Sequence, residues 1–186
     1  MKILKIQKNK ISFSNGVEFS LSKNTIREYK LEESLEIDDK SYMFLAETSA
    51  LSYSYWLLAR RDYSRGELKE KLLLKYRHKQ LVLKILEKLG DMSYLDDYEF
   101  ASSYIASHKN WGRKKLEYYL SMKEVSSSII RELLDDNEDE ELAQIKKIWK
   151  RTKNKEYKKR VESLMRKGFQ YGLIKKAIQE LEDENY

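Results

Sequence analysis

The feature that most constrains the fold of this chain is an internal repeat of helical patterns. Apolar residues spaced for one face of a helix recur along the chain in the same order. Leu68 and Leu72 return 48 residues later as Leu116 and Leu120, and Leu120 returns 44 residues later as Leu164. Repeats of this length are typical of modules that stack a few helices per unit and bury apolar faces between neighbours. A chance self-match between helices is the alternative, but the agreement across two helices and their connecting loop favours a repeat.

The repeat predicts a domain organisation for the whole chain. We divide it into an N-terminal extension, residues 1–40, and three-helix repeats at 41–90, 91–137 and 138–186. Proline is absent and charged residues make up 37% of the chain, which suits long helices with solvated outer faces. The sequence therefore predicts an all-α fold of tandem three-helix repeats with a small β-containing N-terminal extension.

The N-terminal extension has the signals of a small β element. KILKI and KISFS are rich in β-branched residues, and Ser14-Asn15-Gly16 precedes VEFSL. Asn-Gly is a strong hairpin signal because both residues accept the positive φ of tight turns. Ser22 is expected to cap a short helix that runs to Tyr29, and Asp38 or Asp39 to cap the helix after it. In that next helix, the spacing of Leu51, Ser54 or Tyr55, and Leu58 predicts the buried face.

Several classes of protein are excluded by composition. The chain has no cysteine, and its two histidines, His78 and His108, are far apart in sequence, so zinc spacings and Cys-His couples cannot be assembled. The sequence predicts neither catalytic residues, nor a metal site, nor a cofactor. The start, MKILKIQKNKISF, lacks the apolar run of a signal peptide, and no stretch approaches the roughly 18 apolar residues of a membrane span. We therefore expect a soluble, cytoplasmic protein that contacts no membrane.

Charge is distributed unevenly along the chain. Residues 142–168 carry eleven Lys or Arg and two Glu, whereas residues 132–141 carry seven acidic residues and no basic one, within a net charge of +6. Solvated helix faces joined by an acidic connector explain this distribution. A face that binds a polyanion explains it equally well. Both interpretations stay open at the level of the sequence.

The stretch RRDYSRGELKEKL, residues 60–72, divides into structural and candidate binding residues. Ser64 and Glu67 have the spacing of a capping box, in which the serine side chain accepts the glutamate N–H and the glutamate side chain accepts the serine N–H. No base stands beside Ser64 in the sequence, so a cap is a better interpretation than a nucleophile. Basic residues remain without a structural explanation. They are Arg60, Arg61 and Arg65, with Lys69 beside them.

Basic residues occupy the corresponding places in the other two repeats. Backbone amides at a helix start favour anions, so clustered cations there could hold phosphates or carboxylates. The candidate partner- or DNA-binding residues of these repeats are Arg113, Lys114, Lys115, Lys155, Lys158, Lys159 and Arg160. Trp111, Tyr118 and Tyr157 stand nearby, either as base-stacking platforms or as core residues.

Four motifs, taken in order, resemble a known family. They are LARRDYSRGELKEKL (58–72), YLDDYEFASSYI (94–105), GRKKL (112–116) with Leu120, and RKGF (166–169). The series is similar to that of the RecX family, bacterial regulatory proteins that act on the RecA recombinase, and it runs from about residue 50 to the end of the chain. One departure is Lys123-Glu124-Val125, where the family often has a glycine before the aliphatic residue.

The resemblance carries expectations about fold and function. It implies a curved, elongated array of three-helix repeats without catalytic residues. It further implies binding to the RecA–DNA filament, modulation and usually inhibition of its ATPase and strand-exchange activities, and binding to single-stranded or double-stranded DNA. We expect a monomer. Two alternatives stay open, a stand-alone helical protein that binds single-stranded nucleic acid and a protein-interaction scaffold.

Overall fold

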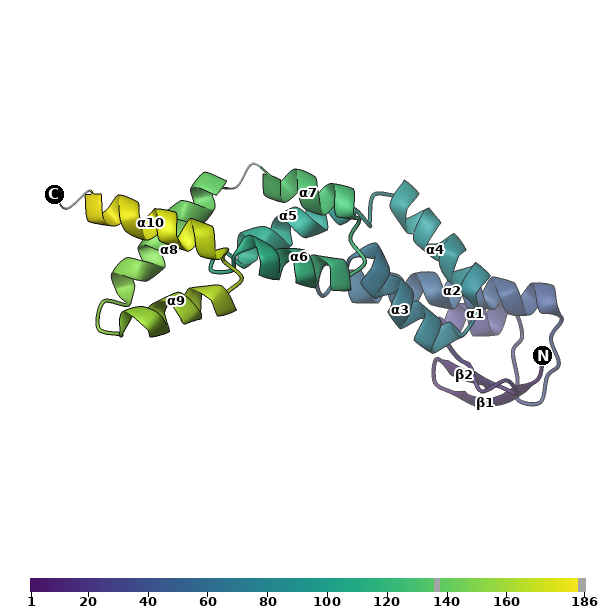
Figure 1. Ribbon diagram of the computed structural model, residues 1–186. Helices are drawn as coiled ribbons and strands as arrows, with labels where there is room; N and C mark the ends of the chain where they lie inside the picture. Colours follow the sequence, from purple (N-terminus) through teal and green to yellow (C-terminus); the bar gives the residue numbers. More distant parts are fainter. Residues whose placement is uncertain (136–137, 184–186) are drawn as a thin grey trace. The chain divides into compact units, whose positions relative to one another are not determined.

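The structure is a computed structural model that describes residues 1–135 and 138–183 (Figure 1). Its strands are β1 (Ile3–Gln7), β2 (Lys10–Phe13) and β3 (Glu18–Ser20). Its helices are α1 (Lys23–Glu28), α2 (Asp39–Leu58), α3 (Arg65–Tyr76), α4 (Lys79–Asp91), α5 (Asp97–Ser107), α6 (Arg113–Met122), α7 (Ser127–Asp135), α8 (Glu138–Arg151), α9 (Tyr157–Arg166) and α10 (Tyr171–Asp183). The predicted helical class with a small β-containing N-terminal extension is confirmed.

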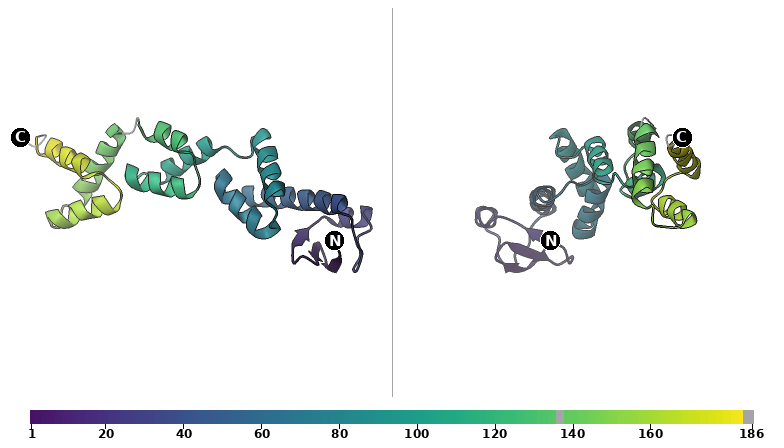
Figure 2. Two further views of the ribbon diagram at one scale, coloured as in Figure 1. Left: turned by 45° about the vertical axis from the view of Figure 1, so that its right-hand side comes forward. Right: turned by 90° about the vertical axis from the view of Figure 1, so that its left-hand side faces the viewer.

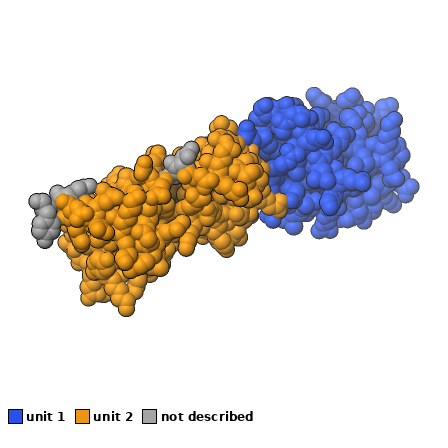
Figure 3. Space-filling view, turned by 45° about the horizontal axis from the view of Figure 1, so that its top comes forward, with its two compact units in different colours: residues 1–96 blue, residues 97–186 orange. Residues whose placement is uncertain are grey.

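The chain forms two compact units, Met1–Asp96 and Asp97–Tyr186 (Figure 3). The first unit contains the sheet and the helices α1 to α4, and the second contains α5 to α10. Each unit is described by itself below. The finer domain boundaries expected from the repeat, at residues 40, 90 and 137, stay a prediction.

The sheet is a meander in the order β1-β2-β3, with antiparallel neighbours. In its second hairpin Ile11 pairs with Phe19, and the chain reverses at the predicted Asn-Gly turn. Gly16 supplies the left-handed backbone, with φ at +76°. Asn15 contributes its side chain, whose amide oxygen accepts the Val17 N–H at 3.1 Å. The predicted hairpin is therefore confirmed, with the two turn residues in different roles.

The sheet packs on α2 (Figure 2). A buried serine connects both to α3. The ring of Phe19 on β3 lies 5.1 Å from that of Tyr42 on α2, measured between centroids. Ser49 of α2 is fully buried, and its Oγ accepts the Ser20 N–H of β3 at 2.9 Å. The same oxygen shares a 2.9 Å hydrogen bond with the Tyr76 hydroxyl of α3. Because the Ser20 amide, the Ser49 hydroxyl and the Tyr76 hydroxyl all have hydrogen-bond partners, burying them costs little free energy.

The buried face of α2 differs from the one predicted. The structure buries Leu45, Ala46, Ser49, Ala50, Ser54 and Leu57. Ser54, one of the two residues expected at the middle of the buried face, is fully buried, whereas the other, Tyr55, is 37% exposed, and Leu51 and Leu58 are only half-buried. The rest of the prediction was wrong because α2 is covered by the sheet, α3 and α4 together, so small residues such as Ser49 lie on its most crowded side.

The start of α3 has the predicted capping box. Ser64 Oγ accepts the Glu67 N–H at 3.1 Å, and a Glu67 carboxylate oxygen accepts the Ser64 N–H at 3.4 Å. Leu68 and Leu72, expected in the core, are inaccessible to solvent. Ser64 therefore caps a helix. Within RRDYSRGELKEKL, Ser64, Glu67, Leu68 and Leu72 have structural roles.

The second unit contains two hydrophobic clusters. One lies among α5, α6 and α7, and its buried residues are Phe100, Ala101, Leu116, Leu120, Val125, Ile130 and Leu134. The other lies among α8, α9 and α10, and it includes Ile145, Trp149, Leu164, Phe169, Ile174 and Ile178. The sequence repeat matches residues of one cluster to residues of the other, such as Leu120 and Leu164, which are 44 residues apart.

Two glycines allow the start of α6 to pack on the end of α9. The Gly112 N–H donates to the Lys167 carbonyl at 2.8 Å, and the Lys114 N–H donates to the Gly168 carbonyl at 3.2 Å. A Cβ on Gly112 would stand 2.5 Å from the Gly168 carbonyl carbon and still closer to the Phe169 amide nitrogen. Gly112 is thus required because the backbone of the α9 end lies too close for a side chain.

Helices α6 and α9 end in the same way. The Phe169 N–H donates to the Leu164 carbonyl at 3.3 Å across Gly168, whose φ is +92°. In α6 the Val125 N–H donates to the Leu120 carbonyl at 3.2 Å, and Glu124 takes the left-handed position with φ at +58°. Glu124 therefore occupies the place of the family's usual glycine without changing the turn.

The acidic stretch of the sequence is largely the start of a helix. Glu138, Asp139, Glu140 and Glu141 make up the first turn of α8, where carboxylates are stabilised by the helix dipole. The expected acidic connector lies partly at residues 136–137, outside the described residues. Glu138 also forms an ion pair with Lys176 of α10 at 3.1 Å. Much of this acidic charge thus has a structural role.

Candidate partner and nucleic-acid interface

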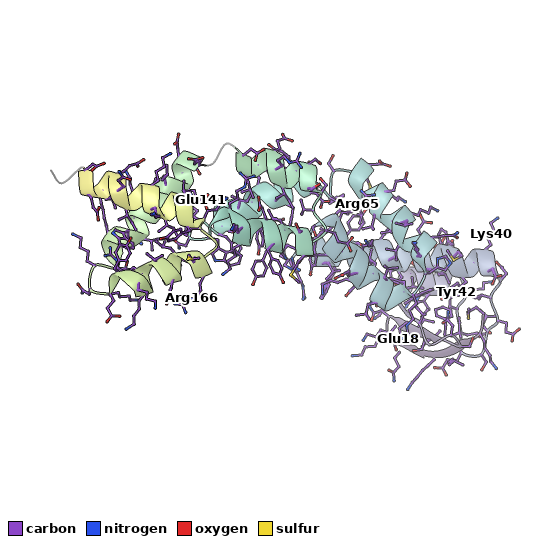
Figure 4. All side chains as sticks on the ribbon, viewed as in Figure 1. Glu18, Lys40, Tyr42, Arg65, Glu141 and Arg166 are labelled. Atoms are coloured by element: carbon purple, nitrogen blue, oxygen red, sulfur yellow. The ribbon has the colours of Figure 1, made fainter. Side chains whose placement is uncertain are left out.

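Arg60 and Arg61 lie just before α3, on the surface of the first unit. The first residue of α3, Arg65, is labelled in Figure 4. The Arg60 guanidinium covers the ring of Trp56 at 3.6 Å. The Arg61 guanidinium covers Tyr63 at 3.6 Å and pairs with Glu67 at 3.2 Å. Partial burial acts to lower the pKa of Arg61, but the hydrogen bond and charge of Glu67 outweigh it and raise the pKa.

The other two candidates in this region belong to α3 itself. Arg65 is exposed and extends toward the end of α4. Its Nη1 lies close to Gly90, at 3.2 Å from the position that a Cβ on this glycine would take. Lys69, one turn later, is half-buried. The structure therefore places the four predicted cations around the start of α3. They differ in exposure and in the rings and carboxylates that they contact.

Arg113 at the start of α6 is held by several groups of its own unit. Its Nε donates to Glu117 at 2.7 Å, its Nη2 donates to Asp135 at 2.6 Å, and its Nη1 donates to the Leu134 carbonyl at 3.1 Å. The hydrogen bonds to Asp135 and Glu117 raise the pKa of Arg113. Because all three guanidinium nitrogens are used, Arg113 ties α6 to the end of α7 in this structure.

The anion position at the start of α6 is already filled by a carboxylate. Glu141 of α8 accepts the Arg113 backbone N–H at 2.8 Å (Figure 4 labels Glu141). Burial raises the pKa of Glu141, although the Arg113 N–H and charge act in the opposite direction. Since the next amide, that of Lys114, bonds the Gly168 carbonyl, a phosphate would have to be held here by side chains.

Lys114 and Lys115 differ in their surroundings. Lys114 is exposed, whereas Lys115 is half-buried and its Nζ lies 4.1 Å from the centroid of the Trp111 ring. The end of α9 packs at this point, and it brings Arg166 and Lys167 from a distant part of the sequence (Figure 4 labels Arg166). These two cations were absent from the predicted set, because only the packing at Gly112 places them here.

The third basic cluster lies at the opposite end of α9. Lys155, Lys158 and Lys159 are exposed, and Lys159 pairs with Glu156 at 3.0 Å. Arg160 instead lies over the Trp149 ring at 3.4 Å and donates to the Trp149 carbonyl at 2.7 Å. Burial lowers the pKa of Arg160.

The two basic clusters of the second unit are therefore not adjacent. The start of α6 contacts the end of α9, and a ten-residue helix separates its two ends by about 15 Å. Equivalent positions in the sequence repeat thus do not by themselves produce a continuous basic stripe within this unit.

The three aromatic residues noted in the sequence have different environments. Trp111 is half-buried against the α5–α7 cluster, which agrees with the core interpretation. Tyr118 and Tyr157 are 60% and 58% exposed, so neither is a core residue. Tyr157 meets Trp149 edge-on at 5.4 Å, and Tyr118 meets Tyr119 edge-on at 5.3 Å. The stacking interpretation is compatible with the geometry of both tyrosines.

A cleft that the sequence did not predict lies in the second unit. Its volume is about 510 Å³, and α5, α6, α7 and α8 all contribute to its walls. Ile105, Leu133 and Phe169 line its apolar part, and His108 and Gln144 line its polar part. Single-sequence patterns cannot reveal it, because its wall residues come from four helices and from the loop after α9, and they lie up to 67 positions apart.

None of the described helices is long and apolar enough to cross a bilayer. Comparison with known proteins gives consistent matches along the chain. A family model described as RecX, second three-helix domain, matches residues 96–134, which include α5 and α6 and nearly all of α7.

Proteins named regulatory protein RecX are similar in sequence. The one from Vibrio vulnificus (strain CMCP6) is 33% identical over 131 residues, covering 66% of this chain and 86% of that protein. The one from Chlorobium limicola is 33% identical over 145 residues, covering 73% and 91%. The one from Bacillus subtilis (strain 168) is 26% identical over 183 residues, covering 90% and 69%.

Two crystal structures are similar in fold. One of regulatory protein RecX has a TM-score of 0.62 at 20% identity and covers 95% of this chain and 97% of the other. One of RecX from Lactobacillus salivarius has a TM-score of 0.59 at 26% identity and covers 75% and 96%. The first likeness, at its low identity, concerns the fold alone.

Proposed function

The chain belongs to the RecX family of regulatory proteins, and from that premise we propose that it regulates the RecA recombinase. In this proposal it binds RecA filaments on DNA and inhibits their ATP hydrolysis and strand exchange, acting as a regulator rather than an enzyme. The observation that carries the proposal is the similarity to proteins named regulatory protein RecX over 86% and 91% of their lengths.

The proposal includes DNA binding by the chain itself. Exposed cations that hold no structural network are the best suited to phosphates, and Lys114, Lys155 and Lys158 fit this description. Arg60 joins them as an exposed guanidinium over an aromatic ring. Arg113 is less suited, because its three guanidinium nitrogens already bond groups of the second unit. The net charge of +6 favours association with a polyanionic filament.

The test is a titration of purified protein into RecA-catalysed, DNA-dependent ATP hydrolysis and strand exchange. We expect both rates to fall, and we expect Lys114→Glu with Lys158→Glu to weaken the inhibition. Lys23→Glu is the matched control, because it reverses an equally exposed charge on α1. Unchanged rates at micromolar protein would refute the proposed function.

A stand-alone protein that binds single-stranded nucleic acid is the second candidate. It is favoured by the cation-covered aromatic rings on the surface, which need no recombinase to bind bases. This candidate predicts salt-dependent binding to single-stranded DNA together with no complex and no effect when RecA is present. Scaffolding through paired acidic and basic helices, the remaining alternative, predicts no DNA binding at low salt.

A further inference from the structure

Two stacked aromatic rings with a cation at each end lie on the surface of the first unit. Tyr53 and Trp56 on α2 are stacked, with centroids 5.9 Å apart and planes 17° apart. The Arg60 guanidinium lies over Trp56 at 3.6 Å, and Lys75 Nζ of α3 lies over Tyr53 at 4.0 Å. We call these four residues the first stack. Its central ring, Trp56, is 48% exposed and lies outside the buried cluster of its unit.

A related stack lies in the second unit. Tyr104 and His108 on α5 are stacked at 4.2 Å, and Trp111 follows His108 at 4.2 Å. Lys123, at the end of α6, places its Nζ 5.2 Å from the Tyr104 centroid. We call these four residues the second stack. All three of its rings are half-buried, so each keeps part of its surface in contact with solvent.

Three members of each stack correspond within the sequence repeat, whereas the positions that correspond to Tyr53 and Trp111 are Ala101 and Tyr63. Trp56 and Tyr104 are 48 residues apart, and so are Arg60 and His108, and Lys75 and Lys123. This is the offset that relates the core leucines Leu68 and Leu116. Core leucines recur because each unit must bury an apolar face, but that requirement does not account for Trp56, which is 48% exposed and lies outside the buried cluster. Tyr104 packs against the α5–α7 cluster, so its position serves both the core and the stack. The recurrence of an aromatic residue with a lysine beside the stack supports a shared binding role.

Stability alone gives a weak explanation for these stacks. A cation over an aromatic ring at an exposed site contributes little, and a single exposed tryptophan is ordinary on a protein surface. The combination of an accessible ring with a lysine or an arginine within a few ångströms is, by contrast, the usual arrangement in proteins that bind single strands. There the ring stacks on a base while the cations lie near the flanking phosphates.

We propose that each stack is a binding site for an unpaired nucleobase, so that this chain prefers single-stranded to double-stranded nucleic acid. The proposal deepens the proposed function and rests on its DNA-binding part. In a duplex the base faces are covered by their neighbours, so only the phosphates remain accessible to the cations. In a single strand a base takes the place of the Arg60 guanidinium on the face of Trp56, and Arg60 and Lys75 contact the phosphates beside it. At the second stack a base takes the place of Lys123 beside Tyr104, and Lys123 contacts the phosphate.

The tryptophans of the chain report directly on this geometry. Trp56 belongs to the first stack, Trp111 to the second, and Trp149 is only 9% exposed beneath Arg160. Addition of an oligodeoxythymidine strand should quench the fluorescence of a variant that keeps only Trp56, with Trp111→Phe and Trp149→Phe. A variant that keeps only Trp149 is the matched control and should show little quenching. Equal quenching of the two variants would contradict base stacking at Trp56.

A set of substitutions separates stacking from charge. Trp56→Leu should weaken binding to oligodeoxythymidine by about tenfold. It should leave the salt dependence of binding unchanged, and Trp56→Phe should restore most of the affinity. Arg60→Gln should instead reduce the slope of log K against log salt by about 0.7. Tyr29→Leu removes an aromatic residue of similar exposure outside the stacks and should change neither quantity.

An abasic strand of the same length gives the decisive comparison. It keeps the phosphates but offers no base, so the wild-type protein and Trp56→Leu should bind it equally, and Tyr104→Leu should behave in the same way. Equal effects of Trp56→Leu on the abasic and base-bearing strands would overturn the inference while the proposed regulation of RecA stands. If the wild-type chain bound neither single nor double strands at low salt, both this inference and the DNA-binding part of the proposed function would fail.

Discussion

Replacing Gly112 with alanine should separate the start of α6 from the end of α9. The added Cβ would stand 2.5 Å from the Gly168 carbonyl carbon, and backbone atoms cannot move aside as a flexible side chain can. Overpacking of this kind costs about 1–3 kcal/mol. Two backbone hydrogen bonds, from Gly112 to Lys167 and from Lys114 to Gly168, would be lost as well at about 1 kcal/mol each. The expected loss of stability is therefore about 3–5 kcal/mol.

Hydrogen exchange measured by mass spectrometry is the appropriate assay, because a chain of two units need not unfold in one step. Amides of α6 and α9 should exchange at least about 100-fold faster in Gly112→Ala, while those of α2 should exchange as in the wild type. Urea unfolding followed by the fluorescence of the buried Trp149 gives a second readout.

Gly172→Ala is the matched control, because a Cβ on Gly172 meets nothing within 4 Å. Gly172 lies in α10, so this change should stabilise the helix by up to about 1 kcal/mol. If Gly112→Ala left stability within about 0.5 kcal/mol of the wild type and exchange in α9 unchanged, the reasoning from backbone contact would be refuted.

Three further predictions concern the two units separately. Arg113→Glu should destabilise the second unit by about 2 kcal/mol, because it removes the hydrogen bonds to Asp135 and the Leu134 carbonyl and sets a third carboxylate beside Asp135 and Glu117. Lys114→Glu should change stability by less than about 0.5 kcal/mol, and urea unfolding compares these neighbours. Glu124→Gly should be more stable than Glu124→Ala by about 1 kcal/mol, because both remove the side chain and only glycine relieves the left-handed backbone; equal melting temperatures would contradict this. Burial raises the pKa of Tyr76 to about 12, so its hydroxyl stays protonated in the folded protein at a pH where the unfolded chain ionises. Stability from this group is therefore complete below pH 10 and is lost as the pH rises toward 12, and Tyr76→Phe should flatten that part of the stability profile measured by chemical unfolding.

The elements that could be predicted from the sequence are those set by neighbouring residues. The Ser64 capping box and the Asn15-Gly16 turn each depend on a few consecutive residues. Their chemistry is local, so a sequence motif identifies them. The repeat also predicted the helical class, because its apolar spacing reflects one buried face per helix. The buried face of α2 was missed because the sheet, α3 and α4 cover it from different sides.

The candidate site was less accessible to sequence reasoning. Arg113, Lys115 and Arg160 were grouped with the exposed lysines because all carry positive charge at a predicted helix start. In the structure Arg113 bonds Asp135, 22 residues away, and Arg160 covers Trp149. Charge is visible in a sequence, but the partner that neutralises or covers it is not.

The sequence by itself determined the helices, their caps and the recurrence of apolar and basic positions, because each follows from interactions within a few residues of the chain. Only the tertiary structure decided which cations remain at the surface and which rings they cover. The 48-residue offset between Trp56 and Tyr104 was present in the sequence, but an aromatic residue at helical spacing is equally suited to the core. Burial distinguishes the two cases, and burial depends on what packs against a residue from elsewhere in the chain.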